Sequence, residues 1–307
     1  MRVCFDSRPA ADRRGIGRYA RCLLESLVEE AQRRGGEIVE GRQPRRRDDL
    51  FHAPWMAGAL LRPRVPMVVT VHDLVQHKRP GEHLRAGLRG GMRHLALARA
   101  TRLIVPTHAV AVDAEEILRV AADRIDVIAE APAASFSPRS AQEVSAARER
   151  HGVPEAYLLW VGDLRHPDPH RRVNALVDAP RELPLVLVGA AGQWARELPG
   201  VTVTGDVDDD ELAALYTGAQ ALLLPSGDEG FGLPAVEALA CGTPVVASDG
   251  PSLREVLDGR ATFVEVGDIA GLVAAAQTVE RPAPAPPSWT WEDAATATWD
   301  VYERALA

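Results

Sequence analysis

The amino-acid sequence predicts an α/β protein made of two doubly wound domains, each built on a parallel sheet. Short apolar runs alternate with amphipathic segments along most of the chain, the pattern of strands alternating with covering helices. The alternation occurs in two series, and a polar stretch around residues 134–153 separates them. At 307 residues, the chain is long for one compact core and comfortable for two domains of ordinary size.

The first series opens with a short apolar strand at residues 2–5 and an amphipathic helix from Gly15 to about Arg34. Apolar side chains recur in that helix at three- and four-residue steps, and a pair of glycines ends it. The charged run at residues 40–49 indicates a solvated loop. The remaining expected elements are strands at 67–71, 103–105 and 125–128 and a helix near 107–120.

The second series opens with a strand at residues 157–161. We expect further strands at 185–188, 221–224, 245–247 and 262–266 and helices near 171–178, 210–217, 234–241, 252–257 and 268–279. A connector with four prolines follows at 281–288 and leads into a last helix, which we expect to pack back against the first domain. The expected domains are 1–145 with the C-terminal helix 290–307, and 146–289.

The composition is typical of a soluble globular protein, with 46% hydrophobic and 25% charged residues. No apolar run is long enough to predict a transmembrane helix, and the N-terminus becomes acidic too early for a secretory signal. Cys4, Cys22 and Cys241 are scattered without metal-site spacing, which indicates reduced, buried thiols in a cytoplasmic protein.

The formal net charge of −8 is unevenly distributed. Residues 1–135 carry 23 Lys+Arg against 17 Asp+Glu, whereas the remainder carries 12 against 26. A basic first half favours an anionic partner or a charged surface, and a solvated arginine face is the alternative.

The most informative segment runs from Glu229 to Glu237, where two carboxylates bracket a glycine-rich turn. The apolar run before it predicts a buried parallel strand, and Pro234 suits the first helical position. Gly230 and Gly232 let the backbone approach a ligand, and a helix N-terminus offers N–H groups to an anion. We therefore expect both acids to face one crevice that binds a ligand with hydroxyls and phosphates, such as a nucleotide sugar. The alternative is a surface loop before a helix whose acidic residue complements the dipole.

The stretch from Ser226 to Ser248 resembles the donor-site signature of retaining family 4 glycosyltransferases, with mannosyltransferase-like members the nearest in character. It reads Ser-Gly-Asp-Glu-Gly-Phe-Gly-Leu-Pro-Ala-Val-Glu-Ala-Leu-Ala-Cys-Gly-Thr-Pro-Val-Val-Ala-Ser. The resemblance extends over most of the chain through shorter landmarks in order. These are Asp6, Arg8, Gly15–Tyr19, Phe51–Pro54, Val71–Leu74, Leu103–Thr107, Tyr157–Gly162 and Thr204–Val207.

This resemblance implies the GT-B fold, in which two Rossmann-like domains face each other across a cleft. The second domain would bind the donor and the first most of the acceptor. The implied reaction is retaining transfer of a hexose from a UDP-, GDP- or dTDP-linked sugar to a hydroxyl of a surface polysaccharide, lipid or natural product. No metal or other cofactor and no nucleic-acid partner is implied, and the expected location is the cytoplasm.

The resemblance also assigns roles by position. Glu229 would hold hydroxyls of the transferred sugar, and Glu237 the ribose diol. Ser226 and the amides of Gly230, Phe231 and Gly232 would support the sugar and diphosphate, and Gly15 and Gly17 would approach the diphosphate from the other domain. His72 follows a strand, where α/β sites form, and would lie beside the donor sugar and acceptor. A loop histidine without a role is the alternative.

The sequence departs from the family after the first strand of the donor domain. The family usually has a lysine or an Arg–Lys pair there to neutralise the leaving diphosphate, but Lys78 is the single lysine of this chain. Arg165 and one of Arg171 and Arg172 are the expected replacements, and spacing alone does not choose between them.

Two further expectations concern partners. Arg85, Arg89 and Arg93 recur every four residues, which suggests peripheral contact with an anionic membrane face or a phosphorylated acceptor, or else a solvated face. The missing lysine motivates a second hypothesis. The protein would then bind a nucleotide sugar or a glycan and would have lost turnover. A phosphorylase of similar fold is the nearest competing enzyme.

Overall fold

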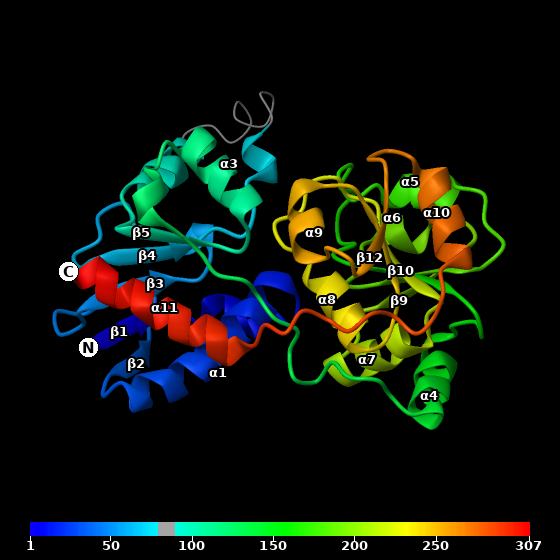
Figure 1. Cartoon of the computed structure of the whole chain (residues 1–307), viewed down its shortest axis with the longest axis horizontal. Coiled ribbons are helices and arrows are strands. Elements are labelled where there is room, and N and C mark those ends of the chain that lie inside the picture. The colour runs from blue at the N-terminus through cyan, green and yellow to red at the C-terminus, as the bar shows by residue number, and fades with distance from the viewer. Residues whose placement is uncertain (79–89) are drawn as a thin grey trace. The chain divides into compact units, whose positions relative to one another are not determined.

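The protein is described by a computed structural model that covers residues 1–78 and 90–307. The chain divides into two compact units, which are unit 1 (Met1–Ala131 with Trp289–Ala307) and unit 2 (Pro132–Ser288). Each unit is a six-stranded sheet of parallel strands with helices packed on it (Figure 1). The predicted α/β class with two doubly wound sheets is therefore confirmed.

The unit boundary lies earlier than the expected position between residues 145 and 146. That position falls inside helix α4 (Ala141–His151), which packs against α7 (Asp209–Gly218) within unit 2. α4 begins with a capping box between Ser140 and Glu143. Its one buried side chain is Ala147, so the sequence shows no apolar stripe there and reads as a polar connector.

The strands of unit 1 lie in the order β2-β1-β3-β4-β5-β6. They are β1 (Arg2–Phe5), β2 (Glu37–Glu40), β3 (Leu50–Ala53), β4 (Met67–Thr70), β5 (Arg102–Val105) and β6 (Ile125–Val127). The sequence analysis did not predict β2 or β3. The exposed terminal glutamates of β2 weaken its apolar signal. The chain adds β2 on one side of β1 and β3 on the other, so the carboxyl ends of β1 and β3 flank the topological switch point of this sheet.

The helices of unit 1 cover both faces of its sheet. α1 (Gly15–Arg33) and α11 (Trp291–Leu306) lie side by side and share one apolar core with the sheet, which includes Leu23, Leu27, Trp299 and Tyr302 (Figure 1). α3 (His108–Leu118) and the helical residues 90–98 contribute to a second core. Short 3-10 turns complete the unit. They are η1 (Arg8–Ala11), η2 (Met56–Gly58), η3 (Val75–His77) and η4 (Ala122–Arg124).

The strands of unit 2 lie in the order β12-β11-β10-β7-β8-β9. They are β7 (Leu158–Val161), β8 (Leu185–Val188), β9 (Val201–Gly205), β10 (Ala221–Leu224), β11 (Val245–Ser248) and β12 (Ala261–Val264). The other helices are α5 (Val173–Asp178), α6 (Gln193–Arg196), α8 (Leu233–Ala240), α9 (Pro251–Val256) and α10 (Ile269–Thr278). The switch point here lies between β7 and β10.

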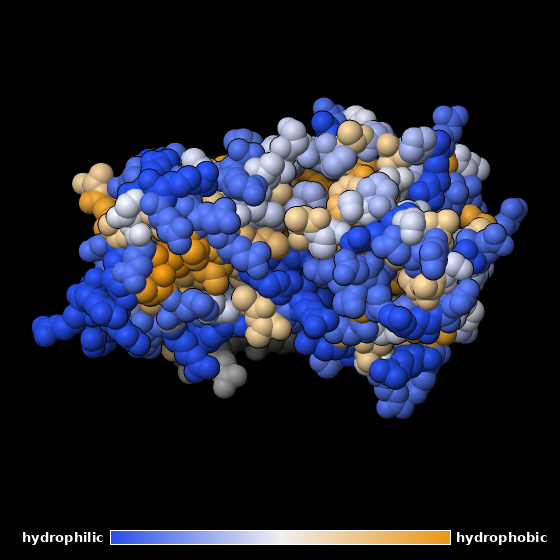
Figure 2. Space-filling view, turned by 90° about the horizontal axis from the view of Figure 1, so that it is seen from below, coloured by the Kyte–Doolittle hydropathy of each residue, from blue (hydrophilic) through white to orange (hydrophobic). Residues whose placement is uncertain are grey.

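The surface is mainly hydrophilic, with apolar side chains gathered over part of unit 1 in the view of Figure 2. Ile16 and Val28 of α1 and Leu306 of α11 are among the exposed large apolar side chains. Within the parts that the structure describes, no helix combines the length and apolarity needed to cross a membrane. Cys4 and Cys241 are buried, and Cys22 is partly exposed.

The first turn of α1 packs directly on the loop that precedes it. A Cβ at Gly17 would overlap the backbone oxygen of Asp12 and come within 2.6 Å of that of Pro9. Backbone atoms cannot move aside as a flexible side chain can. Gly17 therefore has a packing role in unit 1, whatever else it contacts.

We expect Gly17→Ala to lower the free energy of unfolding by about 1–3 kcal/mol, the usual range for overpacking. Gly91 is a matched control, because it also lies in a helix and a Cβ there would meet nothing within 4 Å. Gly91→Ala should raise stability by up to about 1 kcal/mol. Urea unfolding of both variants measures the difference, and equal effects would contradict the packing argument.

A buried polar chain of side chains ties α11 to the sheet of unit 1. His52 Nδ1 lies 2.6 Å from the Tyr302 hydroxyl, and its Nε2 lies 3.0 Å from Thr70 Oγ1. The hydroxyl of Tyr19 lies 3.1 Å from the same Thr70 atom. His52 is fully buried, and this burial lowers its pKa to about 3. His52 is therefore a neutral core histidine.

This neutral histidine should make unit 1 sensitive to acid. Between pH 6.5 and about 3 the unfolded chain binds a proton at His52 that the folded chain does not, so stability is lost as pH falls. The contribution should reach about 1.4 kcal/mol per pH unit. Denaturant titrations of wild type and His52→Gln from pH 7 to 4 measure it, with exposed His108→Gln as control. Parallel curves for wild type and His52→Gln would contradict the neutral assignment.

Candidate functional site

The loops after the strands of unit 2 gather at one edge of its sheet. Because the strands are parallel, their carboxyl ends share that edge. Gly227, after β10, touches Val266, after β12, so closely that a Cβ on the glycine would overlap the valine side chain. A Cβ at Gly250, after β11, would lie 2.6 Å from the Gly227 oxygen. Three strand-end loops thus pack into one surface beside the switch point.

Glu229 lies in the loop after β10, where the sequence placed it. The hydroxyl of buried Ser226 donates a hydrogen bond to Glu229 Oε1. The Glu229 side chain is partly exposed, and the serine fixes its direction. Ser226 therefore orients the carboxylate from the end of the strand.

The N-terminus of α8 follows directly. Gly232 is the N-cap and has a φ of 88°, a left-handed conformation that favours glycine. A Cβ there would also lie 2.7 Å from Leu253 of α9. Pro234 occupies the first turn, which begins at Leu233. Phe231 is buried at 4% exposure and anchors the turn by its ring.

The position of Glu237 differs from the expectation. It is the fifth residue of α8 rather than part of its first turn, and it is fully buried. Its Oε2 accepts a hydrogen bond of 3.2 Å from the Tyr216 hydroxyl of α7. Glu237 therefore contacts α7 and is not exposed, unlike the acid facing an open crevice that the sequence predicts.

The three candidate arginines lie in different surroundings. Arg165 pairs with Asp163 two residues away, through Nε at 3.0 Å and Nη2 at 2.5 Å. Arg171 lies over the end of β7, where its Nη1 is 2.6 Å from the position of a Cβ on Gly162. It also forms a 3.5 Å ion pair with Asp168.

Arg172 has a φ of 48°, which is uncommon for a residue with a side chain, and is the N-cap of α5. Its Nη1 lies 3.3 Å from the position of a Cβ on Gly267, the residue after Val266. Val266 touches Gly227 in the Glu229 loop. Arg172 therefore reaches the packed strand-end loops, and Arg171 lies at the end of β7.

The switch point of unit 1 carries a buried acid. Asp6, directly after β1, accepts hydrogen bonds from Arg8 Nε at 2.7 Å and Nη2 at 2.6 Å. It also accepts one of 3.0 Å from Trp55 Nε1, two residues after β3. Burial raises the pKa of Asp6, and these hydrogen bonds outweigh it, so the pKa is lowered. Sequence reasoning missed Trp55, although an aromatic side chain after a central strand is the signal to look for.

His72 lies close to this edge of unit 1, two residues after β4. Its Nδ1 is 2.9 Å from Glu130 Oε1, and its Nε2 is 3.0 Å from the Pro54 oxygen. The Tyr19 ring meets it edge-on, with centroids 4.5 Å apart. Burial lowers the pKa of His72, but the hydrogen bond and charge of Glu130 and the Pro54 carbonyl raise it above its ordinary value. The sequence placed His72 at the strand end and missed Glu130.

Gly15 and Gly17 open α1 in unit 1. Gly15 has a φ of 42° with free space around its Cα, and Gly17 packs on the preceding loop. Their approach to a diphosphate stays a prediction.

The structure tests only part of the expectations about the arginine row and about metal binding. Arg93 is exposed on residues 90–98, whereas Arg85 and Arg89 lie outside the described residues. Over residues 1–78 and 90–307, no three His, Cys, Asp or Glu side chains come together as a metal site would require. Membrane contact and independence from metals stay predictions.

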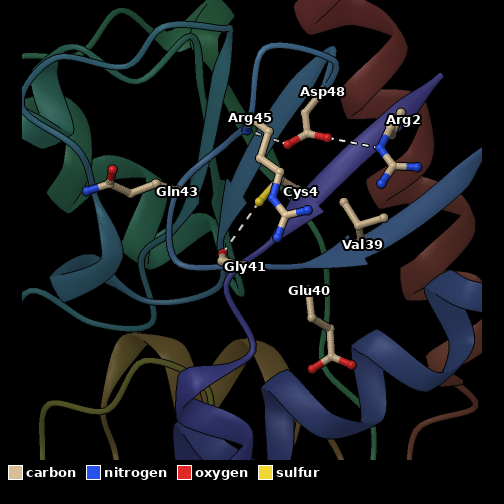
Figure 3. A pocket seen from close by; sticks show the side chains of 8 residues that line it. All are labelled: Arg2, Cys4, Val39, Glu40, Gly41, Gln43, Arg45 and Asp48. Atoms are coloured by element: carbon tan, nitrogen blue, oxygen red, sulfur yellow. Dashed lines mark hydrogen bonds and ion pairs between the residues drawn. The ribbon is translucent and has the colours of Figure 1, made fainter.

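A small cavity of about 150 Å³ lies in unit 1, lined by residues of β1, the end of β2 and the loop after it (Figure 3). Asp48 closes it by accepting from Arg2 Nε at 3.0 Å and from the Arg45 backbone N–H at 2.5 Å. Cys4 also lines it and donates to the Gly41 oxygen at 3.5 Å. Burial raises the pKa of Cys4 to about 11, so this thiol is not a nucleophile near neutral pH.

Known families match both units. The profile of the family described as Glycosyl transferases group 1 matches residues 155–280, and that of Glycosyltransferase Family 4 matches residues 45–130. The solved structure of Anabaena Alr3699/HepE in complex with UDP and glucose superposes with a TM-score of 0.68 at 17% identity. The match covers 99% of this chain and 95% of that one.

Curated relatives agree with these profiles. D-inositol 3-phosphate glycosyltransferase of Xylanimonas cellulosilytica is 31% identical over 82% of this chain and 69% of its own length. The protein of the same name from Pseudarthrobacter chlorophenolicus is 32% identical over 78% and 62%. O-antigen chain mannosyltransferase B of Escherichia coli is 27% identical over 73% and 63%. The chain thus spans 62% to 69% of the length of these relatives, and it belongs to the group 1 and family 4 glycosyltransferases, with the α/β layout of the GT-B fold.

Proposed function

We propose that this protein is a retaining glycosyltransferase that moves a hexose from a nucleotide diphosphate sugar to an acceptor hydroxyl. One observation carries the proposal. At the switch point of unit 2, Ser226 orients the Glu229 carboxylate beside the glycine-capped N-terminus of α8. A carboxylate that accepts hydroxyls next to N–H groups that bind phosphate suits a sugar linked to a diphosphate. Membership of the glycosyltransferase family supports it.

The donor is assigned to unit 2. Glu229 accepts hydrogen bonds from the sugar hydroxyls, each worth about 1.5–3 kcal/mol because the acceptor is charged. The amides at Gly230, Phe231 and Gly232 and the helix dipole favour the diphosphate. Glu237, whose Oε2 accepts from Tyr216, is assigned to the ribose diol by its position in the family motif.

The proposed sugar and acceptor classes are drawn from the relatives. Alr3699/HepE was solved with UDP and glucose, and another relative is named a mannosyltransferase, so glucose or mannose on a nucleoside diphosphate is the proposed donor. The proposed acceptor is a hydroxyl of a polyol phosphate or of a growing glycan. Unit 1 provides its site at the ends of β1 and β3, where Asp6 and Trp55 lie.

The leaving diphosphate needs a cation. Asp163 engages Arg165 closely through two nitrogens, whereas Arg171 meets Asp168 only at 3.5 Å, so the role is assigned to Arg171 and Arg172 beside the strand-end loops. Arginine is always charged and can donate to a phosphate through two N–H groups. The leaving phosphate helps to deprotonate the acceptor on the same face of the sugar, and the protein contributes positioning and charge stabilisation.

A nucleotide-sugar-binding protein without turnover is the second candidate. The pairing of Arg165 with Asp163 favours it, because a cation already engaged by an acid stabilises a leaving diphosphate less, while donor binding does not require that step. Calorimetric binding of a donor, with no nucleotide diphosphate released in the presence of any candidate acceptor, would support this function over transfer.

We expect Glu229→Gln to lower nucleotide diphosphate release by roughly 100-fold or more, because it removes the charge that holds the sugar. The assay uses UDP-glucose, GDP-mannose and dTDP-glucose with inositol phosphates and glycans as acceptors. Asp228→Asn is the matched control, since it removes a carboxylate from the same loop, and should retain activity. A fully active Glu229→Gln would refute the assignment, and silence of the wild type with every pair would refute transfer.

The arginine assignment gives a separate test. Arg171→Gln and Arg172→Gln should each lower kcat by about 10- to 1000-fold, as expected for removing one group that stabilises developing charge. Arg165→Gln should have the smaller effect, because its charge is already paired with Asp163. Steady-state kinetics with the active donor decides, and a larger loss in Arg165→Gln would reverse the assignment.

A further inference from the structure

The imidazole of His72 joins the ends of three strands of unit 1. His72 follows β4, Glu130 follows β6 and Pro54 follows β3. The ring bonds to Glu130 Oε1 at 2.9 Å through Nδ1 and to the Pro54 oxygen at 3.0 Å through Nε2. Its side chain is 13% exposed and that of Glu130 is 4% exposed, so solvent does not replace either bond.

The two partners determine the protonation of the ring. A backbone carbonyl oxygen can only accept, so Nε2 must carry a proton. An ionised carboxylate can also only accept, so Nδ1 must carry one as well. A histidine that donates from both nitrogens is an imidazolium, and the carboxylate of Glu130 balances its charge.

We propose that Glu130 is a positioning residue that holds His72 as a fixed imidazolium at the carboxyl edge of the unit 1 sheet. An imidazolium has no lone pair with which to take the proton of an acceptor hydroxyl. His72 therefore acts as a fixed positive charge beside the acceptor and not as a general base. The role of His72 as a fixed charge beside the acceptor rests on the proposed transferase function. The ion pair between His72 and Glu130 does not depend on that function.

The other groups near His72 are consistent with this state. Tyr19 of α1 meets the His72 ring in a T-shaped contact and adds no charge, and His52 of β3 is neutral because it is fully buried. Asp73, the next residue, accepts from the Val75 backbone N–H at 3.2 Å and adds a favourable charge. Asp6, after β1, is paired with Arg8. Glu130 is thus the carboxylate bonded to the ring, and its charge is the one to remove in a test.

Nuclear magnetic resonance of the ring nitrogens tests the ion pair in the full chain. With ¹⁵N-histidine labelling, the signals lost in His72→Gln identify this ring. In the wild type, it should stay doubly protonated at pH 7 and lose its proton only at a pH above the ordinary histidine pKa of about 6.5. A neutral His72 ring at pH 7 would overturn the proposal without any variant.

Glu130→Gln then tests the role of the carboxylate. The midpoint of the His72 titration should fall by at least about one pH unit, the effect of losing an opposite charge at this distance. Asp126→Asn is the matched control, because it removes an acid from β6 that pairs with Arg102 and Arg304 instead, and should leave the midpoint unchanged. Glu130→Asp, which keeps the charge, should restore most of the midpoint. An unchanged midpoint in Glu130→Gln would refute the role of Glu130.

The activity profile tests the second step. For an active donor and acceptor pair, kcat/KM of the wild type should fall as pH rises through the His72 midpoint. In Glu130→Gln, this fall should move to lower pH by the same amount, which a purely structural role would not produce. If kcat/KM did not change with pH around the His72 midpoint, the fixed-charge role would be refuted. Absence of any transfer would refute the proposed function, and the spectra would still decide the ion pair.

Discussion

The parallel direction of the strands is the constraint on which both candidate sites depend. Parallel strands need crossover helices, so every strand leaves its sheet at the same edge and the loops after them meet there. In unit 2 this brings Glu229, after β10, to the edge that also holds the loop after β7. In unit 1 it brings Asp6, His72 and Glu130 from three separated segments to one edge. Functional side chains more than a hundred residues apart in the sequence thus lie at one edge of a sheet, because backbone hydrogen bonds align the strands that carry them.

Each important carboxylate is held by a donor that its own unit supplies. Ser226 holds Glu229, Tyr216 holds Glu237, and Arg8 with Trp55 holds Asp6. An unpaired buried charge costs far more than a paired one, so these donors are required wherever the acid is buried. They also fix the direction of each carboxylate before a ligand arrives, which lowers the ordering cost of binding. Stability and preorganisation thus have the same source.

The sequence analysis predicts most of the strands but misses α4 and also the short strands β3 and β9. Strands β8 and β10 are found at their predicted residues because apolar runs such as Ala221–Leu224 have one interpretation, whereas α4 buries a single alanine and has no signal. Glu229 was predictable because its partners lie within a dozen residues. Glu130 was not, since it meets His72 across 58 residues and two strands. The burial of Glu237 depends on the packing of α7, which no local pattern contains.

Several arginines of the first half form ion pairs inside unit 1. Arg2 pairs with Asp48, Arg8 with Asp6, Arg34 with Glu30 and Arg102 with Asp126. These arginines fasten loops and strand ends, so their charges are engaged by acids of the same unit and are less available to a partner. A fixed imidazolium at the strand edge therefore matters more than its single charge suggests. It places a cation where substrate chemistry is proposed, and its counter-ion Glu130 is nearly buried behind it.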